Sequence, residues 1–193
     1  ATKDIRLLSA VIFFPLYHPT MIAKLTTTLD IASGGRLTLG IGIGGEVPTD
    51  FAAMGLSPRS RGARTNEGLA LLRRLYTEEH VTHTGRYFPV EDITLKPSAI
   101  QTPHPPIWVA GRRDAAIKRA AHYGDGWLPY FYNPERYIDS VAKIKQEAQT
   151  IGRDISDFQW GYYGFMAITD TEKEGAQVAG NNLIQRYRTN RDP

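Results

Sequence analysis

The chain has no cysteine among its 193 residues. Disulfide bonds, cysteine nucleophiles and thiolate metal ligands are therefore excluded from these residues, and the absence is consistent with a reducing, cytoplasmic location. The sequence also has no apolar run near the roughly 20 residues that span a bilayer, and no small-residue cleavage site follows its first apolar run. These absences favour a cytoplasmic protein without a membrane partner.

Basic and acidic residues are nearly balanced in number. The net charge is +3, from 23 Lys and Arg against 20 Asp and Glu, and the basic residues are scattered along the chain. A nucleic-acid-binding protein usually gathers them on one face, so we expect no nucleic acid partner. The length of the chain and its hydrophobic fraction of 41% are enough to form a buried hydrophobic core. We expect residues 1–193 to form a single domain.

Apolar runs typical of buried strands alternate with helical segments five times. An extra hairpin is expected over 80–90, around Thr84 and Gly85. Strict alternation predicts an α/β fold with a parallel sheet and right-handed crossovers. An eight-unit barrel takes about 250 residues, so an open doubly wound sheet and an incomplete barrel are both compatible with this length. The expected strands cover 5–14, 37–43, 107–110, 126–128 and 158–168. The expected helices begin near 18, 58, 114, 133 and 171, with caps at His18 and Asn133 and with Gly34 and Gly35 ending the first helix.

The stretch GIGIGG, residues 40–45, matches the pattern G-x-G-x-x-G. Its first two glycines lie inside an expected strand, and the segment from Glu46 to Leu56 is predicted to be a loop. The dinucleotide-binding turn requires a helix to start at the third glycine, so the context disfavours that interpretation. Two others stay open: a helix packs closely on Gly40 and Gly42, or their bare face is a slot for a flat ring.

The stretch IWVAGRRDAA, residues 107–116, joins a strand to a helix through Gly111, Arg112 and Arg113. In a parallel sheet this junction lies on the ligand-binding side, where the free N–H groups and the dipole of the helix attract anions. The positive charges of the two arginines would add to this attraction, and the arginines would bind phosphate. The alternative is that Asp114 caps the helix and the arginines are only solvated.

Histidine positions do not suggest a metal site. His80 and His83 are three residues apart on an expected strand and so point to opposite faces. Two ligands of one metal must lie on the same face, and the sequence therefore predicts no metal.

Four blocks in order and spacing resemble the bacterial luciferase-like monooxygenase family, including its deazaflavin-dependent oxidoreductases: FPLYHPTMIAKLTTTLDIASGGRLTLGIGIGG, RSRGARTNEGLALLRRLY, TGRYFPV and KPSAIQTPHPPIWVAGRRDAAIKRAAHYGDGW. The resemblance covers residues 5 to about 170. It implies a TIM (β/α)8 barrel that is incomplete here, comprising about the third to the seventh strand with an inserted hairpin.

The resemblance also implies a cofactor, either FMN or the deazaflavin coenzyme F420, at the carboxyl ends of the strands. NADPH is a candidate electron donor, the substrate is a small molecule, and a homodimer is expected. Arg112 and Arg113 would hold the phosphate, and a non-proline cis peptide after Ser9 would lie under the ring. No catalytic residue is assigned, since the family places such residues on early strands. The implied cofactor-binding residues are Ser9, Ala10, Gly44, Gly45, Ala110, Gly111, Arg112 and Arg113.

Three functions remain as hypotheses. The first is an oxidoreductase that carries out hydride transfer or monooxygenation on a small organic substrate. The second is a non-catalytic fragment that binds a phosphorylated ligand. The third, a phosphosugar-type barrel enzyme, is disfavoured because the expected strand ends carry residues such as Phe13, Gly44 and Pro129 in place of lysine or carboxylate.

Overall fold

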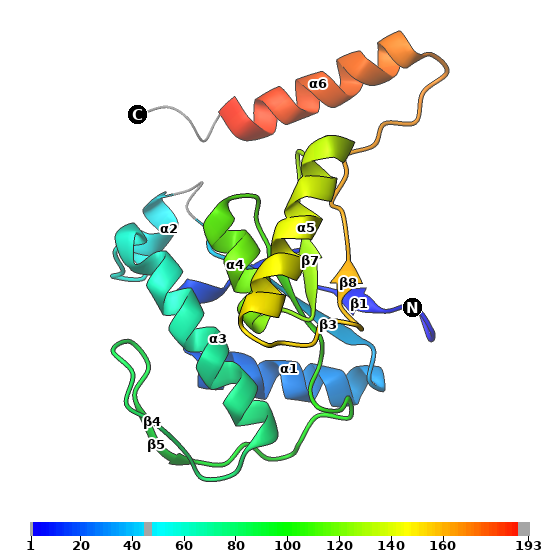
Figure 1. Cartoon of the computed structure of the whole chain (residues 1–193). Helices are drawn as coiled ribbons and strands as arrows, with labels where there is room; N and C mark the ends of the chain where they lie inside the picture. Colours follow the sequence, from blue (N-terminus) through cyan, green and yellow to red (C-terminus); the bar gives the residue numbers. More distant parts are fainter. Residues whose placement is uncertain (1, 45–47, 189–193) are drawn as a thin grey trace.

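A computed structural model describes residues 2–44 and 48–188 of the chain. Its main sheet is parallel, in the order β1-β3-β6-β7-β8, and β2 also pairs with β3. Figure 1 shows helices α1, α3, α4 and α5 in one layer over this sheet. The α/β class is therefore confirmed. The strands are β1 Leu7–Leu8, β2 Ile12–Phe13, β3 Leu37–Gly42, β6 Ile107–Ala110, β7 Gly126–Leu128 and β8 Gln159–Trp160.

The helices begin close to the predicted positions because the predicted caps form. His18 accepts a hydrogen bond from the Thr20 backbone N–H before α1, and Gly34 ends that helix with φ 68°. Asn133 caps α5 through the Arg136 N–H. The elements are η1 Phe14–Leu16, α1 Pro19–Ser33, α2 Pro48–Ala53, η2 Pro58–Ser60, α3 Arg61–Thr77, α4 Asp114–Tyr123, α5 Pro134–Thr150 and α6 Glu172–Arg188.

Alternate residues of the central strands point to the helix layer and form the core. Leu39, Ile41 and Ile107 are at most 2% exposed and pack with residues of α1 and α3. Val109 and Trp127 are equally buried and pack with α4 and α5. The other face of the same strands points away from the helices, as the interior of a barrel does. Because helices cover only one face of the sheet, the structure favours a piece of a barrel over the doubly wound alternative, which has helices on both faces.

The predicted hairpin is present as β4 Val81–His83 and β5 Val90–Ile93, paired antiparallel. Its loop is tied to α3 by Glu67, whose carboxylate accepts three consecutive backbone N–H groups of residues 86–88. His80 faces Asp92 and His83 faces Glu67, so the two histidines face separate carboxylates. Within the described residues no three potential ligands come together around a metal position.

The single strand predicted over 5–14 is wrong. Two short strands, β1 and β2, take its place, and both pair with β3. Between them the Ser9 hydroxyl accepts a hydrogen bond from the Gly40 N–H at 2.9 Å and lies 3.2 Å from the Gly40 carbonyl oxygen, to which it donates. The side chain thus occupies the backbone groups that a continuous ladder would use, and the chain bulges at this point.

The bulge explains the glycines of β3. A Cβ on Gly40 would lie 1.9 Å from the Ser9 carbonyl oxygen, and one on Gly42 would lie 2.7 Å from Cγ2 of Val11. The bare face of β3 is therefore covered by residues 9–11 of the neighbouring strand. The interpretation that a helix packs closely on Gly40 and Gly42 is wrong, because the close approach is made by Ser9 and Val11 of the bulge.

Two further predictions are wrong in extent. The loop predicted from Glu46 to Leu56 contains helix α2. The strand predicted over 158–168 is reduced to β8, followed by one isolated bridge between Tyr130 and Tyr163. The reason is that this segment has a partner strand on one side only within the described part, and Met166 and Ile168 are 86% and 93% exposed. Helix α6 lies apart from the other helices in Figure 1.

A charged cluster joins the amino ends of β6 and β7 to the helix layer. The Asp125 carboxylate contacts Arg73 at 3.1 Å and Arg153 at 3.3 Å, and it accepts the Ile107 N–H at 3.0 Å. His104 is 5% exposed beside it, stacked on Tyr76 with a centroid distance of 5.5 Å. Burial lowers the pKa of His104, which favours the neutral form of the ring.

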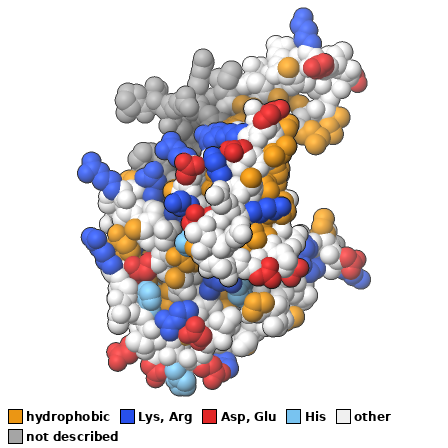
Figure 2. Space-filling view, in the orientation of Figure 1, with side chains coloured by type: hydrophobic (Ala, Val, Ile, Leu, Met, Phe, Trp, Pro, Cys, Tyr) orange, Lys and Arg blue, Asp and Glu red, His pale blue; other side chains and the backbone are white. Residues whose placement is uncertain are grey.

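The surface agrees with the charge pattern of the sequence. Figure 2 shows Lys and Arg spread over the visible face and interspersed with Asp and Glu, with hydrophobic side chains gathered below α6 and along α5. Among the helices of the described part, none combines the length and the apolar character that crossing a bilayer requires.

Gly40→Ala tests the close approach of the bulge to β3. The new methyl would overlap the Ser9 carbonyl oxygen, and we expect the free energy of unfolding to fall by at least about 1–3 kcal/mol, the usual cost of overpacking. Gly180→Ala is the matched control, since it adds the same methyl in open space within α6 and should not destabilise the protein. Equal stability of the two variants in urea unfolding would contradict the described packing.

The buried His104 predicts a specific loss of stability in acid. Because its pKa in the folded chain is lowered, the unfolded chain binds more protons below its ordinary pKa of about 6.5. The free energy of unfolding should then fall as the pH decreases from about 6.5 towards the lowered value, by up to about 1.4 kcal/mol per pH unit. In His104→Asn this part of the slope should disappear. Parallel stability curves for the two proteins between pH 7 and 5 would refute the prediction.

Candidate functional site

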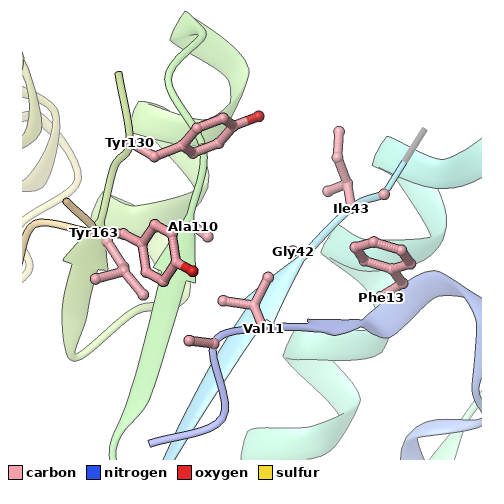
Figure 3. Close-up of a pocket in the computed structure, with 11 residues that line it drawn as sticks. Val11, Phe13, Gly42, Ile43, Ala110, Tyr130 and Tyr163 are labelled. Carbon is pink, nitrogen blue, oxygen red and sulfur yellow. The ribbon is translucent and has the colours of Figure 1, made fainter. Parts of the chain in front are cut away.

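An open cavity of about 340 Å³ lies at the carboxyl ends of the strands. Its size falls within the usual range of ligand pockets. Figure 3 shows side chains from both arms of the sheet directed around it. The carboxyl edge of a parallel sheet is where such folds bind ligands. The cavity is lined by Ala10, Val11, Phe13, Gly42, Ile43, Gly44, Ala110, Gly111, Leu128, Tyr130 and Tyr163.

The structure brings four of the predicted cofactor residues to this cavity: Ala10, Gly44, Ala110 and Gly111. They come from the bulge after β1 and from the ends of β3 and β6, which are far apart in sequence. Ser9 does not line the cavity, because its side chain is bound to Gly40. The prediction for Gly45 lies outside the described residues, as does that for Glu46.

The predicted cis peptide is displaced by one residue. The structure has a non-proline cis bond between Ala10 and Val11, where the resemblance implied one between Ser9 and Ala10. Ser9 is fixed against Gly40 through both backbone groups of that glycine. Both residues of the cis bond, Ala10 and Val11, line the cavity.

The loop of residues 111–113 has all its carbonyl oxygens bound by residues of the neighbouring strand and of the helix layer. Each carbonyl accepts from a side chain or from the first turn of α4, and the N–H groups of Arg112 and Arg113 make no hydrogen bond within the described residues. The donors are Trp127 Nε1 to Gly111 at 2.9 Å, the Tyr132 hydroxyl and Arg136 Nη2 to Arg112 at 2.9 and 3.0 Å, and the Ala116 N–H to Arg113 at 2.7 Å.

A glycine is required at the start of this loop. Gly111 has φ 129°, and a Cβ there would lie 2.7 Å from the Ala116 Cβ. This close approach brings the amino end of α4 directly beside the end of β6. Arg113 is the N-cap of α4 and makes no capping hydrogen bond through its side chain, and Asp114 lies in the first turn. The interpretation that Asp114 caps the helix is therefore wrong.

The two arginines differ in their surroundings. Arg112 is half-buried, and its guanidinium lies 5.0 Å from the ring centre of Tyr130 and 5.8 Å from that of Phe131. Neither arginine forms an ion pair within the described part of the chain. Arg113 is exposed. Arg112 is thus held beside the rings at the rim of the cavity without an ion-pair partner in the described part, and Arg113 is exposed to solvent.

Trp108 occupies the inner face of the sheet below the cavity. It lies one inner position before Ala110 along β6, and its indole covers two glycines of the neighbouring strands. A Cβ on Gly126 would lie 2.6 Å from the indole, and one on Gly161 would lie 2.5 Å from it. A side chain at either glycine would therefore collide with the Trp108 ring.

Sequence analysis missed several lining residues: Val11, Ile43, Leu128, Tyr130 and Tyr163. Phe13 was noticed at a strand end without being assigned to the site. A signal was available for part of this set, because residues directly after parallel strands meet at one edge. The aromatic run after β7, PYFY at 129–132, follows that rule. Tyr163 gave no such signal, since the predicted strand continued past it.

Comparison with known proteins now identifies the chain. A family model described as luciferase-like monooxygenase matches residues 1–192. The chain belongs to the luciferase-like monooxygenase family. Its parallel sheet, one-sided helices and cavity at the strand ends agree with the incomplete TIM barrel expected for a member of this family.

One curated relative carries the name of a cofactor. The chain is 28% identical over 181 residues to the FMNH(2)-dependent dimethylsulfone monooxygenase of Pseudomonas putida, and the match covers 92% of this chain and 48% of that protein. The chain thus spans about half the length of this curated relative.

Solved structures show the same fold. A monooxygenase from Streptomyces bottropensis superposes with TM-score 0.81 at 28% identity, over 97% of this chain and 57% of that one. The coenzyme F420 dependent tetrahydromethanopterin reductase of Methanopyrus kandleri gives TM-score 0.79 at 21% identity, over 96% and 57% of the two chains. The described sheet is therefore about half of a luciferase-like barrel.

Gly111→Ala tests the geometry of the loop at the rim. The substitution combines a backbone conformation that L-residues rarely adopt with a collision against Ala116, and we expect a loss of about 2–4 kcal/mol in the free energy of unfolding. Gly55→Ala is the control, because Gly55 has φ 65° with nothing within 4 Å and should show only the backbone cost of about 1–2 kcal/mol. A Gly111→Ala variant as stable as Gly55→Ala would mean that α4 does not approach β6 so closely.

Proposed function

We propose that this chain is the part of a flavin- or deazaflavin-dependent oxidoreductase that holds the cofactor phosphate and one side of its ring. The observation that carries the proposal is the loop of residues 111–113, with its carbonyls bound by the neighbouring strand and the helix layer. Such a loop at a helix amino end offers N–H donors and a positive dipole to an anion. Arg112 adds a full charge at the same rim.

The cavity supports the proposal because a flat ring fits its chemistry. Gly42, Gly44 and Gly111 form walls without side chains, and a Cβ on Gly44 would come within 3.2 Å of the Phe13 ring. The remaining wall is apolar or aromatic. A ring bound there would lie against backbone on one arm of the sheet and against Leu128 and the tyrosines on the other.

Two cofactors remain compatible with these residues, FMN and coenzyme F420. One is named in the dimethylsulfone monooxygenase relative and the other in the reductase with the same fold. Either would supply two-electron hydride chemistry, and reduced flavin would also activate dioxygen. The described residues would bind the phosphate, orient the ring and keep water from the apolar wall.

Binding without turnover is a second candidate for this chain. Among the described residues that line the cavity, the only side chains with a proton to donate are Tyr130 and Tyr163. Histidine and carboxylate side chains, the groups most often used for proton transfer, do not line the cavity among the described residues. This part of the barrel would then bind the cofactor without supplying a proton-transfer residue.

The phosphate clamp predicts a selective loss of affinity in Arg112→Ala. A charge-assisted hydrogen bond contributes about 1.5–3 kcal/mol, so the dissociation constant for FMN should rise by roughly 10- to 150-fold in a fluorescence titration of the 193-residue chain. Riboflavin has the same ring without the phosphate, and its affinity should not change. The same titration with F420 decides between the two cofactors.

Arg59→Ala provides the matched control, since Arg59 is exposed in η2 and its side chain makes no hydrogen bond or ion pair within the described residues. This variant should bind FMN as the natural chain does. Failure of the natural chain to bind both FMN and F420 would overturn the proposed function. Equal FMN affinity of Arg112→Ala and Arg59→Ala would overturn the role of Arg112.

A further inference from the structure

Tyr163 is placed over the cavity by the last strand of the sheet. It follows β8, its backbone N–H donates to the Pro129 carbonyl at 2.9 Å, and it bridges to Tyr130 in parallel register. Phe165 contacts the Tyr163 ring edge-on with a centroid distance of 5.3 Å. Figure 3 shows the ring leaning into the cavity, with its hydroxyl on the side of Ala110 and Val11. Backbone pairing and an aromatic contact therefore fix the direction of this phenol.

The Tyr163 hydroxyl is a polar group in an apolar wall. It makes no hydrogen bond within the described residues, and Tyr163 is 37% exposed and lines the open cavity. Apart from Tyr130, every other lining side chain is aliphatic, aromatic or absent. The two phenols point in different directions in Figure 3. The Tyr163 hydroxyl is therefore a hydrogen-bond donor available to a ligand on the wall formed by the segment after β8.

The charge of the lining restricts what can bind beside the cofactor. No lysine, arginine, aspartate or glutamate lines the cavity among the described residues. Moving an ionised group into such surroundings without a partner costs far more than moving a neutral one. Arg112 stands at the rim over the aromatic rings, where the proposed function already gives it the phosphate. An anionic substrate would find no cation on this wall.

We propose that Tyr163 determines substrate specificity, by donating a hydrogen bond to the oxygen of a small neutral molecule such as a ketone. This inference rests on the proposed function for the cofactor, and it adds the chemical class of the substrate and the residue that recognises it. Tyr163 positions the oxygen. The apolar side chains around it accept the hydrocarbon part and exclude carboxylates.

The neighbouring Tyr162 supplies a matched control. Its side chain points to the other side of the extended segment, where its hydroxyl donates to the Tyr132 carbonyl at 3.2 Å, and it does not line the cavity. Tyr162→Phe and Tyr163→Phe each remove one hydroxyl from an exposed ring. The two variants differ in whether that hydroxyl faces the cavity.

The test uses the 193-residue chain with bound FMN or F420, whichever it binds, and three probes of one shape. Cyclohexanone has an acceptor oxygen, methylenecyclohexane has none, and cyclohexanecarboxylate is charged. Dissociation constants come from NMR titrations that follow the ring carbons of labelled tyrosines. We expect the natural chain to bind the ketone about three- to tenfold more tightly than the alkene, the effect of one neutral hydrogen bond. The carboxylate should bind more weakly than either neutral probe.

In Tyr163→Phe the preference for the ketone should fall to about onefold, so that the ketone and the alkene bind equally, and Tyr162→Phe should keep the full preference. Retention of the preference in Tyr163→Phe would overturn the proposal, as would tighter binding of the carboxylate. Absence of ketone binding in a chain that binds its cofactor would also overturn it. Absence of cofactor binding is a different result, because it contradicts the proposed function, and the three probes can then be titrated into the chain alone to judge Tyr163 separately.

Discussion

The site depends on the orientation of three peptide groups, those that follow β6 at residues 111–113. Their carbonyl oxygens are bound by Trp127, by Tyr132 with Arg136, and by the first turn of α4. Since each carbonyl is occupied, the N–H groups and the helix dipole are left for a ligand. Trp127 is fully buried in the core between α4 and α5, so the same packing that stabilises the sheet also fixes the loop.

Glycines serve two different purposes in this half-barrel. Gly40 and Gly42 allow the bulge of the neighbouring strand to lie directly on β3, and Gly111 allows α4 to approach β6. Gly44 and Gly111 in addition leave backbone exposed at the cavity wall. One arm of the cavity is therefore built from backbone, and the other arm carries Leu128 and the two tyrosines. This asymmetry suits a flat ring with a polar tail.

Much of the fold could be predicted from the sequence, because strand periodicity and helix caps are local signals. The strands at 37–43, 107–110 and 126–128 and the caps at His18, Gly34 and Asn133 agree with the structure within one residue. Long-range packing decided the rest. The apolar run at 5–14 is interrupted because the Ser9 hydroxyl binds Gly40, a contact between residues 31 positions apart.

The cavity was predicted only in part for the same reason. Gly44 and Gly111 were implied by the family resemblance, whereas Tyr163 is brought in by pairing with residues more than 30 positions earlier. Helix α1 shows the limit of periodicity: Leu25 and Leu29 are 58% and 46% exposed, and Asp30 is fully buried. Asp30 is buried because it accepts hydrogen bonds from the Ile100 and Gln101 N–H groups and from the Gln101 side chain, contacts that no helical pattern reveals.

The orientation of the loop after β6 can be observed directly by NMR of the amide groups. Adding FMN to the isotope-labelled chain should move the N–H signals of residues 112–114 strongly, and riboflavin, which has no phosphate, should move the signals at the cavity wall but leave those of 112–114 in place. The account is contradicted if FMN and riboflavin shift the same amides equally, or if the FMN-specific shifts fall at another part of the chain.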